Sequence, residues 1–159
     1  MIKEGDDLPD ITLRSVADDG MQNVNLHENF HQKKILIICV PGAFTSTCHN
    51  QHLPPFIKGA EQLMSEKNID KICCITTNDP FVLDKWRESL GESKIVFLSD
   101  GNFDFLEKTQ LIRNHKNSFM GDRLMRSVLI VENISISKII IDNPGELEKT
   151  SFQNILKTV

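Results

Sequence analysis

The order of apolar and polar positions along this chain predicts alternating strands and helices. Continuous apolar runs at residues 34–40, 71–77 and 95–98 are typical of strands that are buried on both faces of a sheet. In the two segments between these runs, apolar residues recur every three or four positions, which is the spacing of one helix face. Strands that alternate with helices in this way favour an α/β fold.

Both of these helices have recognisable beginnings. The first follows residue 48, and Pro54 and Pro55 near its start each remove a backbone donor. We therefore expect the helix to kink there, with a first turn that is loosely tied to the remainder. The second helix has Asp79 as its cap and Pro80 as its first residue, which is a common way for a helix to begin.

A hairpin is predicted ahead of the first buried run. Residues 11–14 and 21–26 are short and moderately apolar, and Asp18-Asp19-Gly20 between them is a turn signal. The chain would thus begin with two antiparallel strands before it enters the alternating part of the fold.

The second half of the chain has a different pattern. A short helix is predicted at 103–111, a polar and irregular segment at 110–124, strands at 127–132 and 134–141, and a C-terminal helix at 146–159. No repeat or linker interrupts the sequence. We expect one domain over residues 1–159, of the α/β class, with a central mixed β-sheet flanked by helices.

One loop carries the residue best suited to chemistry. The segment 40–49 follows the first buried run and leads into the first helix, which places Cys48 near a helix N-terminus. Backbone N–H groups there lack partners and the helix dipole is positive, so a thiolate is favoured over a thiol. Cys48 is therefore the candidate nucleophile.

The neighbours of Cys48 narrow down its chemistry. Thr45 stands where a C-x-x-C oxidoreductase has its first cysteine, so a disulfide within this loop is excluded. A threonine hydroxyl can instead hydrogen-bond a thiolate and an oxygen substrate, and Pro41 would shield the sulfur from water. Such a site suits attack on an O–O bond.

Composition excludes several other classes of function. With 159 residues, 40% apolar and 25% charged, the chain has the composition of an ordinary globular domain. A net charge of −4 and a pI near 5.7 argue against binding to nucleic acid or to an anionic membrane. No apolar run has the length of a signal or membrane segment, and four cysteines without framework spacing favour a reducing compartment. We expect the cytoplasm, or an organelle matrix.

The motif Pro41-x-x-x-Thr45-x-x-Cys48 resembles the active-site signature of peroxiredoxins. The string Pro-Gly-Ala-Phe-Thr, and His52-Leu53-Pro54 after the cysteine, resemble the type II branch, which includes glutaredoxin-linked and thioredoxin-linked enzymes. The likeness extends from Gly5 to the C-terminus. It implies a thioredoxin-like fold of the peroxiredoxin type, with an N-terminal β-hairpin.

The resemblance also implies roles for individual residues. Arg126 matches the family's active-site arginine, which would pair with the Cys48 sulfur and polarise a bound peroxide. Gly42, Phe44 and His52 would contribute to the substrate pocket, with His52 structural or tuning the thiol. The expected activity is thiol-dependent reduction of hydrogen peroxide and alkyl hydroperoxides, with peroxynitrite as a further candidate, through a sulfenic acid on Cys48.

No cofactor is expected for this reaction. The chain has no Gly-rich phosphate loop and no metal-ligand cluster, and the chemistry needs neither haem nor flavin. His27 and His31 have the i, i+4 spacing of a metal pair but no third ligand nearby, so we assign them no role.

The electrons must then come from another thiol. The C-terminal segment where some type II relatives carry a resolving cysteine has none here. Cys39, Cys73 and Cys74 lie in predicted strands and are expected to be buried and structural. The sequence therefore predicts a one-cysteine enzyme without a resolving cysteine, reduced by glutathione with glutaredoxin or by thioredoxin.

Two questions stay open at this point. A redox sensor or relay, which would pass oxidation from Cys48 to a partner protein, uses the same sulfur as a peroxidase. By resemblance the chain forms a homodimer, for which Phe44, Phe81 and residues near Phe119 are candidate contacts, although each could instead be a core aromatic.

Overall fold

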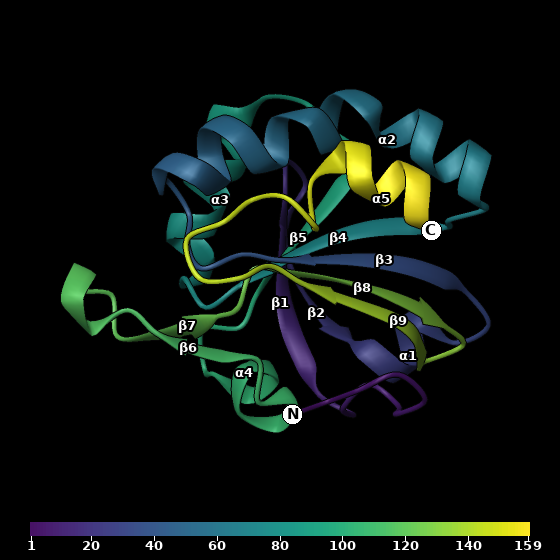
Figure 1. Ribbon diagram of the computed structural model, residues 1–159, viewed down its shortest axis with the longest axis horizontal. Coiled ribbons are helices and arrows are strands. Elements are labelled where there is room, and N and C mark those ends of the chain that lie inside the picture. The colour runs from purple at the N-terminus through teal and green to yellow at the C-terminus, as the bar shows by residue number, and fades with distance from the viewer.

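A seven-stranded mixed sheet forms the centre of the molecule (Figure 1). The computed structural model describes the backbone of residues 1–159 and every side chain except that of Cys48. The strand order is β2-β1-β5-β4-β3-β8-β9. These strands are β1 (Thr12–Ala17), β2 (Gly20–Asn25), β3 (Lys34–Cys39), β4 (Lys71–Thr76), β5 (Ile95–Ser99), β8 (Ser127–Glu132) and β9 (Ser135–Ile141).

The three apolar runs form the middle of this sheet, as predicted. Strands β3, β4 and β5 are parallel to one another, whereas β1 and β8 flank them in antiparallel orientation. Strands β1 and β2 form the expected N-terminal hairpin. The α/β class, the central mixed sheet and the hairpin are thus confirmed.

Helices cover both faces of the sheet (Figure 1). On one face lie α2 (Leu53–Lys67), α3 (Pro80–Leu90) and α5 (Phe152–Thr158), and on the other lie α1 (Leu26–Phe30) and α4 (Asp104–Thr109). Adjacent residues of a strand point to opposite faces of the sheet. In β4, Cys74 packs in the core on the side of α2, α3 and α5, and Cys73 packs in the core on the side of α1 and α4. None of the described helices is long and apolar enough to cross a membrane.

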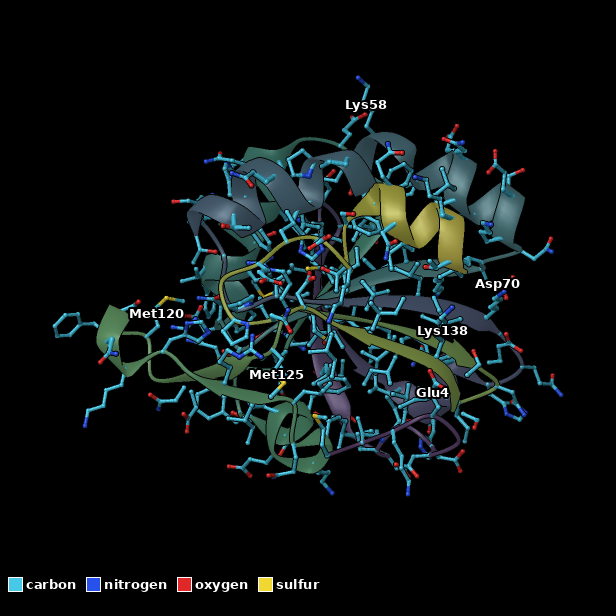
Figure 2. The ribbon with its side chains drawn as sticks, in the orientation of Figure 1. Glu4, Lys58, Asp70, Met120, Met125 and Lys138 are labelled. Atoms are coloured by element: carbon cyan, nitrogen blue, oxygen red, sulfur yellow. The ribbon has the colours of Figure 1, made fainter. Side chains whose placement is uncertain are left out.

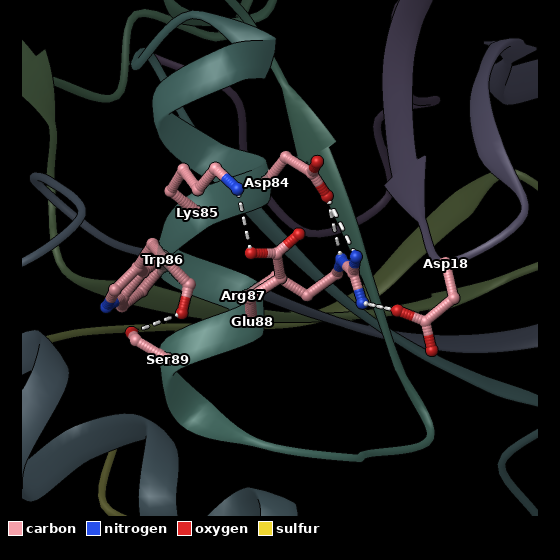
Figure 3. Close-up of polar contacts among 7 residues, drawn as sticks. All are labelled: Asp18, Asp84, Lys85, Trp86, Arg87, Glu88 and Ser89. Carbon is pink, nitrogen blue, oxygen red and sulfur yellow. Dashed lines mark hydrogen bonds and ion pairs between the residues drawn. The ribbon is translucent and has the colours of Figure 1, made fainter.

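Polar side chains hold helix α3 at its N-terminus and near its C-terminus. The Asp79 side chain caps it by accepting from the N–H groups of Phe81 and Val82. Further along, the guanidinium of Arg87 contacts Asp84 in the same helix and Asp18 in the β1–β2 turn, at 2.8 Å for Asp18 (Figure 3). The hairpin is therefore tied to α3 by an ion pair.

Two predicted segments are corrected by the structure. The segment 110–124 is not irregular: β6 (Ile112–Asn114) and β7 (Asp122–Leu124) pair with each other and carry the short helix η2 (Lys116–Ser118) outward as an arm (Figure 1). The predicted C-terminal helix at 146–159 begins only at α5, because backbone N–H groups ahead of it donate to the side chain of Asp142.

Helix α5 packs closely against α2. Gly59 leaves room for the Phe152 ring between the two helices.

The turn between β8 and β9 has no glycine. Asn133 and Ile134 both have positive φ values, 48° and 67°, which non-glycine residues rarely adopt. The Asn133 side chain accepts from the N–H of Gln32 at 2.9 Å and so supports this conformation.

Candidate active site

Strand register brings the cysteine loop and Arg126 to the same edge of the sheet. Cys39, at the end of β3, pairs with Ser127, at the start of the antiparallel β8, and Ser127 in turn pairs with Ile141 of β9. The residues that follow Cys39, precede Ser127 and follow Ile141 must therefore lie together. They are Pro41 to Cys48, Arg126, and the loop that begins at Asp142.

The turn that carries Cys48 has an unusual backbone. Residues Cys48–His52 form a π-helical turn, η1, and Pro54 and Pro55 follow within the first turn of α2. Pro54 and Pro55 lack the N–H groups that would bond the preceding carbonyls in an α-helix, and the backbone just ahead of them forms a wider π turn. The expected irregularity is present, but it is a π turn. The side chain of Cys48, the candidate nucleophile, lies outside the described residues.

Side chains tie this turn to its surroundings more firmly than the prolines alone suggested. The indole Nε1 of Trp86 in α3 donates to Nδ1 of His49 at 3.0 Å, and the His49 ring stacks on Phe44 with centroids 6.0 Å apart. The π turn is therefore anchored to α3 on one side and, through His52, to the C-terminal loop on the other.

A pocket of about 200 Å³ opens beside the turn. It brings together residues from four separate parts of the chain, among them Pro41, Thr45, Arg113, His115, Met120 and Arg126. Three of the sequence-predicted site residues, Pro41, Thr45 and Arg126, thus line one small cavity. Pro41 is buried there.

The Thr45 hydroxyl has a defined orientation. It donates its proton to the carbonyl of Gly42 at 2.9 Å, so its remaining lone pairs are available as hydrogen-bond acceptors. A second contact holds the loop, because the N–H of Ala43 donates to the side chain of Asn78, which lies just after β4. A side chain on Gly42 would meet Arg123 and Thr45 at 3.2 Å, so this position favours glycine.

Arg126 is the first member of a buried chain of hydrogen bonds. Its Nη1 donates to Nδ1 of His52 at 2.8 Å, and His52 Nε2 donates to the carbonyl of Thr150 at 3.1 Å. The Thr150 hydroxyl donates to the carboxylate of Asp142. Arg126 is 9% exposed and the other three at most 1%. This chain fixes the guanidinium of Arg126 beside the pocket.

The protonation state of His52 follows from this arrangement. Burial, and then the positive charge of Arg126, lower the pKa of His52 from 6.5 to about 4, against the opposing effects of the Thr150 carbonyl and Asp142. His52 is therefore neutral at pH 7, with its proton on Nε2. Only a neutral ring can accept from Arg126 through Nδ1.

The lowered pKa predicts a pH dependence of stability. Between pH 6.5 and 4 the unfolded chain takes up a proton at this histidine that the folded chain refuses, so the free energy of unfolding falls as the pH is lowered. We expect the stability of His52→Gln, relative to the wild type, to gain roughly 3 kcal/mol between pH 7 and pH 4. Denaturant titrations at several pH values measure this difference.

Because Asp100 also titrates in this range, the difference in stability between His52→Gln and the wild type is more informative than the pH profile of either protein alone. Burial raises the pKa of Asp100 to about 6, so its contribution to stability is lost as the pH rises through that value, opposite to His52. This contribution is present in both proteins and cancels in the comparison. His31→Gln, which changes an exposed histidine, serves as the control, and equal profiles for His52→Gln and the wild type would contradict the prediction.

The remaining predicted residues fall into two groups. Gly42 supports the site through its carbonyl, whereas Phe44, 52% exposed, and His52, buried behind Arg126, do not line the cavity. Cys39, Cys73 and Cys74 are buried in β3 and β4, as expected. Burial raises the pKa values of Cys39 and Cys73 to about 12.

Sequence reasoning missed several residues that build the site. Thr150 contacts His52 across 98 residues of chain, and Asp142 accepts a hydrogen bond from Thr150. No local pattern marks either residue. The sequence marks Trp86 only as a residue of the predicted second helix, and it does not predict the hydrogen bond of its indole to His49.

Comparison with known proteins identifies the family of this chain. The sequence model of the Redoxin family matches residues 3–156. Peroxiredoxin-2D of Arabidopsis thaliana is 37% identical over 160 residues, covering 99% of this chain and 98% of that protein. The chain belongs to the peroxiredoxin family. The type II resemblance is confirmed by this relative, and this peroxiredoxin is a thiol-dependent peroxidase, an enzyme that reduces peroxides.

Solved peroxiredoxin structures confirm the thioredoxin-like fold. Reduced Prx3 of Vibrio vulnificus, solved in complex with hydrogen peroxide, is 33% identical with a TM-score of 0.91, over 99% of this chain and 98% of that one. The antioxidant protein of Plasmodium falciparum, described as a 1-Cys peroxiredoxin, is 32% identical with a TM-score of 0.90, over 97% and 96%.

Proposed function

We propose that this peroxiredoxin uses Cys48 as its peroxidatic residue, with Arg126, Thr45 and Pro41 forming the site around it. The observation that carries the proposal is the placement of Arg126. Its guanidinium is buried at a small pocket, is fixed by a neutral histidine, and lines that pocket together with Thr45. A fixed positive charge at this position stabilises a thiolate and the negative charge that develops on a departing oxygen.

The reaction then proceeds in balanced steps. The Cys48 thiol loses its proton to solvent, and the thiolate attacks the terminal oxygen of the hydroperoxide. The O–O bond breaks, the alkoxide or hydroxide leaves and takes up a proton, and the sulfur is oxidised to a sulfenic acid. Thr45 accepts a hydrogen bond from the hydroperoxide O–H, since its own proton is held by Gly42. Pro41 excludes water from the sulfur.

We further propose a one-cysteine cycle with an external thiol as reductant. A first thiol attacks the sulfenic sulfur and releases water, and a second thiol breaks the resulting mixed disulfide. The burial of Cys39, Cys73 and Cys74 supports this, because a thiol with a pKa near 12, as for Cys39 and Cys73, is almost entirely protonated and inert at neutral pH. Glutathione with glutaredoxin, or thioredoxin, would supply the electrons.

Assembly and location belong to the same proposal. Phe44, Phe81 and Phe119 are 52%, 72% and 99% exposed, so none is a core aromatic, and exposed aromatics of this size favour a contact surface in a homodimer. Sedimentation equilibrium of the wild type would measure this. Four cysteines without framework spacing favour a reducing compartment, which would be the cytoplasm or an organelle matrix.

The decisive experiment follows the sulfur directly. The wild type and a Cys39→Ser, Cys73→Ser, Cys74→Ser triple variant are treated with one equivalent of hydrogen peroxide or tert-butyl hydroperoxide, and sulfenic acid is trapped with dimedone. We expect the adduct on Cys48 in both proteins, and turnover of both with glutathione and glutaredoxin or with a thioredoxin system. An adduct elsewhere would overturn the site assignment, whereas loss of turnover in the triple variant would overturn the one-cysteine cycle.

A further inference from the structure

The part of the pocket lining that comes from β6 and the residues just after it is basic and contains an unsatisfied nitrogen. Arg113, in β6, and His115, just after it, line the same cavity as Thr45 and Arg126. The Nε2 atom of His115 is buried and has no hydrogen-bond partner among the described side chains and backbone. A buried polar atom without a partner is rare in native proteins and calls for an explanation.

Arg113 and its neighbour Arg123 are not neutralised by the protein. Arg113 makes one long hydrogen bond, 3.5 Å, to the carbonyl of Asp142, and Arg123 donates to the carbonyls of Met120 and Pro41. No described carboxylate forms an ion pair with either arginine. Arg123 holds the loop through these two bonds, whereas most of the five N–H donors of Arg113 have no acceptor among the described side chains and backbone.

The electrostatics of this part of the lining are consistent with the contacts. Burial first, and then the charges of Arg113, Arg123 and Arg126, lower the pKa of His115. His115 therefore lies in a positive field and is neutral at pH 7. Figure 2 shows several side-chain nitrogen atoms, in blue, in the region between the labelled Met120 and Met125.

We propose that Arg113 and His115 form a subsite that binds a carboxylate, carried either by the hydroperoxide or by the thiol reductant. Arg113 presents a fork of N–H donors that matches two carboxylate oxygens, and a neutral His115 protonated on Nε2 donates to one of them. The inference rests on the proposed function, because the pocket is the one that holds the peroxide.

One acidic side chain limits the strength of the subsite. Glu146 also lines the pocket, and its carboxylate accepts from the side chain of Asn143. It is exposed, so solvent screens its charge. The carboxylate of Asp142 accepts from the N–H groups of Glu148, Lys149 and Thr150 and is thereby engaged on the side of the C-terminal loop.

The test compares matched ligands with and without a carboxylate. In the oxidation arm, linoleic acid hydroperoxide and its methyl ester, both below their critical micelle concentrations, oxidise the reduced enzyme. In the reduction arm, 3-mercaptopropionate and 2-mercaptoethanol reduce the oxidised enzyme. The measured quantity in each arm is the rate constant of the reagent with a carboxylate divided by that of the reagent without one. When this ratio is compared between proteins, the intrinsic reactivity of each reagent cancels.

We expect Arg113→Gln to lower this ratio at least fivefold in one or both arms, which also identifies the source of the carboxylate. Lys116→Gln removes the same charge from the exposed arm outside the pocket and should keep both ratios within twofold of the wild type. Unchanged ratios in Arg113→Gln, or an equal fall in Lys116→Gln, overturn the proposal.

A second variant protects the test against misfolding. Glu146→Gln removes the opposing carboxylate at an exposed position, and we expect it to raise the affected ratio at least twofold. No change in either arm would again overturn the subsite. Failure of the proposed function looks different, since the wild type would then react with neither the ester nor 2-mercaptoethanol.

Discussion

Replacement of Arg126 by glutamine is expected to lower the second-order rate constant for oxidation by hydrogen peroxide by about 10²–10³-fold. The substitution removes a buried positive charge from the pocket, and it removes the N–H group from which His52 accepts a hydrogen bond. Both the population of the Cys48 thiolate and the stabilisation of the leaving oxygen should fall. Stopped-flow fluorescence of Trp86, the single tryptophan, can follow the reaction, because its indole contacts His49 next to Cys48.

Controls separate the charge of Arg126 from its shape. Arg126→Lys keeps the charge but loses the planar fork, and we expect a rate constant between those of the wild type and the glutamine variant. Cys48→Ser gives the baseline without reaction. Thermal unfolding of each variant shows whether the fold survives. A rate constant within threefold of the wild type for folded Arg126→Gln would remove Arg126 from the mechanism.

The sheet could be predicted from the sequence because its signal is local. The runs that became β3, β4 and β5 are continuously apolar, and burial on both faces requires that pattern. The arm formed by β6 and β7 gave no such signal, since each strand has three residues and pairs only with the other.

The start of the C-terminal helix could not be predicted for a related reason. Residues from Glu146 onward have acceptable helical spacing, but the N–H groups of Glu148, Lys149 and Thr150 donate to the Asp142 carboxylate. This tertiary interaction overrides the local preference. The helix begins only where the hydroxyl of Ser151 caps it by accepting from Asn154.

The candidate site shows the same division. Cys48, Thr45 and Pro41 are close in sequence, so their spacing predicted a shared loop. Arg126 was predicted by family resemblance, and the structure supplies its physical reason, which is the register of β3 with β8. The contacts of Thr150 with His52 and Asp142 depend on the final fold and were not accessible from the sequence.

Asp142→Ala is expected to cause the largest loss of stability, about 2–4 kcal/mol. Asp142 is 1% exposed and accepts four hydrogen bonds, three from backbone N–H groups and one from the Thr150 hydroxyl. Its removal leaves the buried donors of Thr150 without an acceptor, whereas the N–H groups of Glu148 and Lys149 can reach solvent. For a domain of this size the thermal midpoint should fall by roughly 5–12 °C.

The loss should also reach the active site, because Thr150 positions His52 and His52 positions Arg126. In Asp142→Ala we therefore expect slower oxidation of Cys48 at temperatures where the variant is still folded. Thr150→Val removes only the hydroxyl and keeps the carbonyl that His52 binds, so it should lose stability with a much smaller effect on the rate. If both variants lost stability and neither changed the rate constant, the chain from Asp142 to Arg126 would be structural only, and the guanidinium would be held by its remaining contacts.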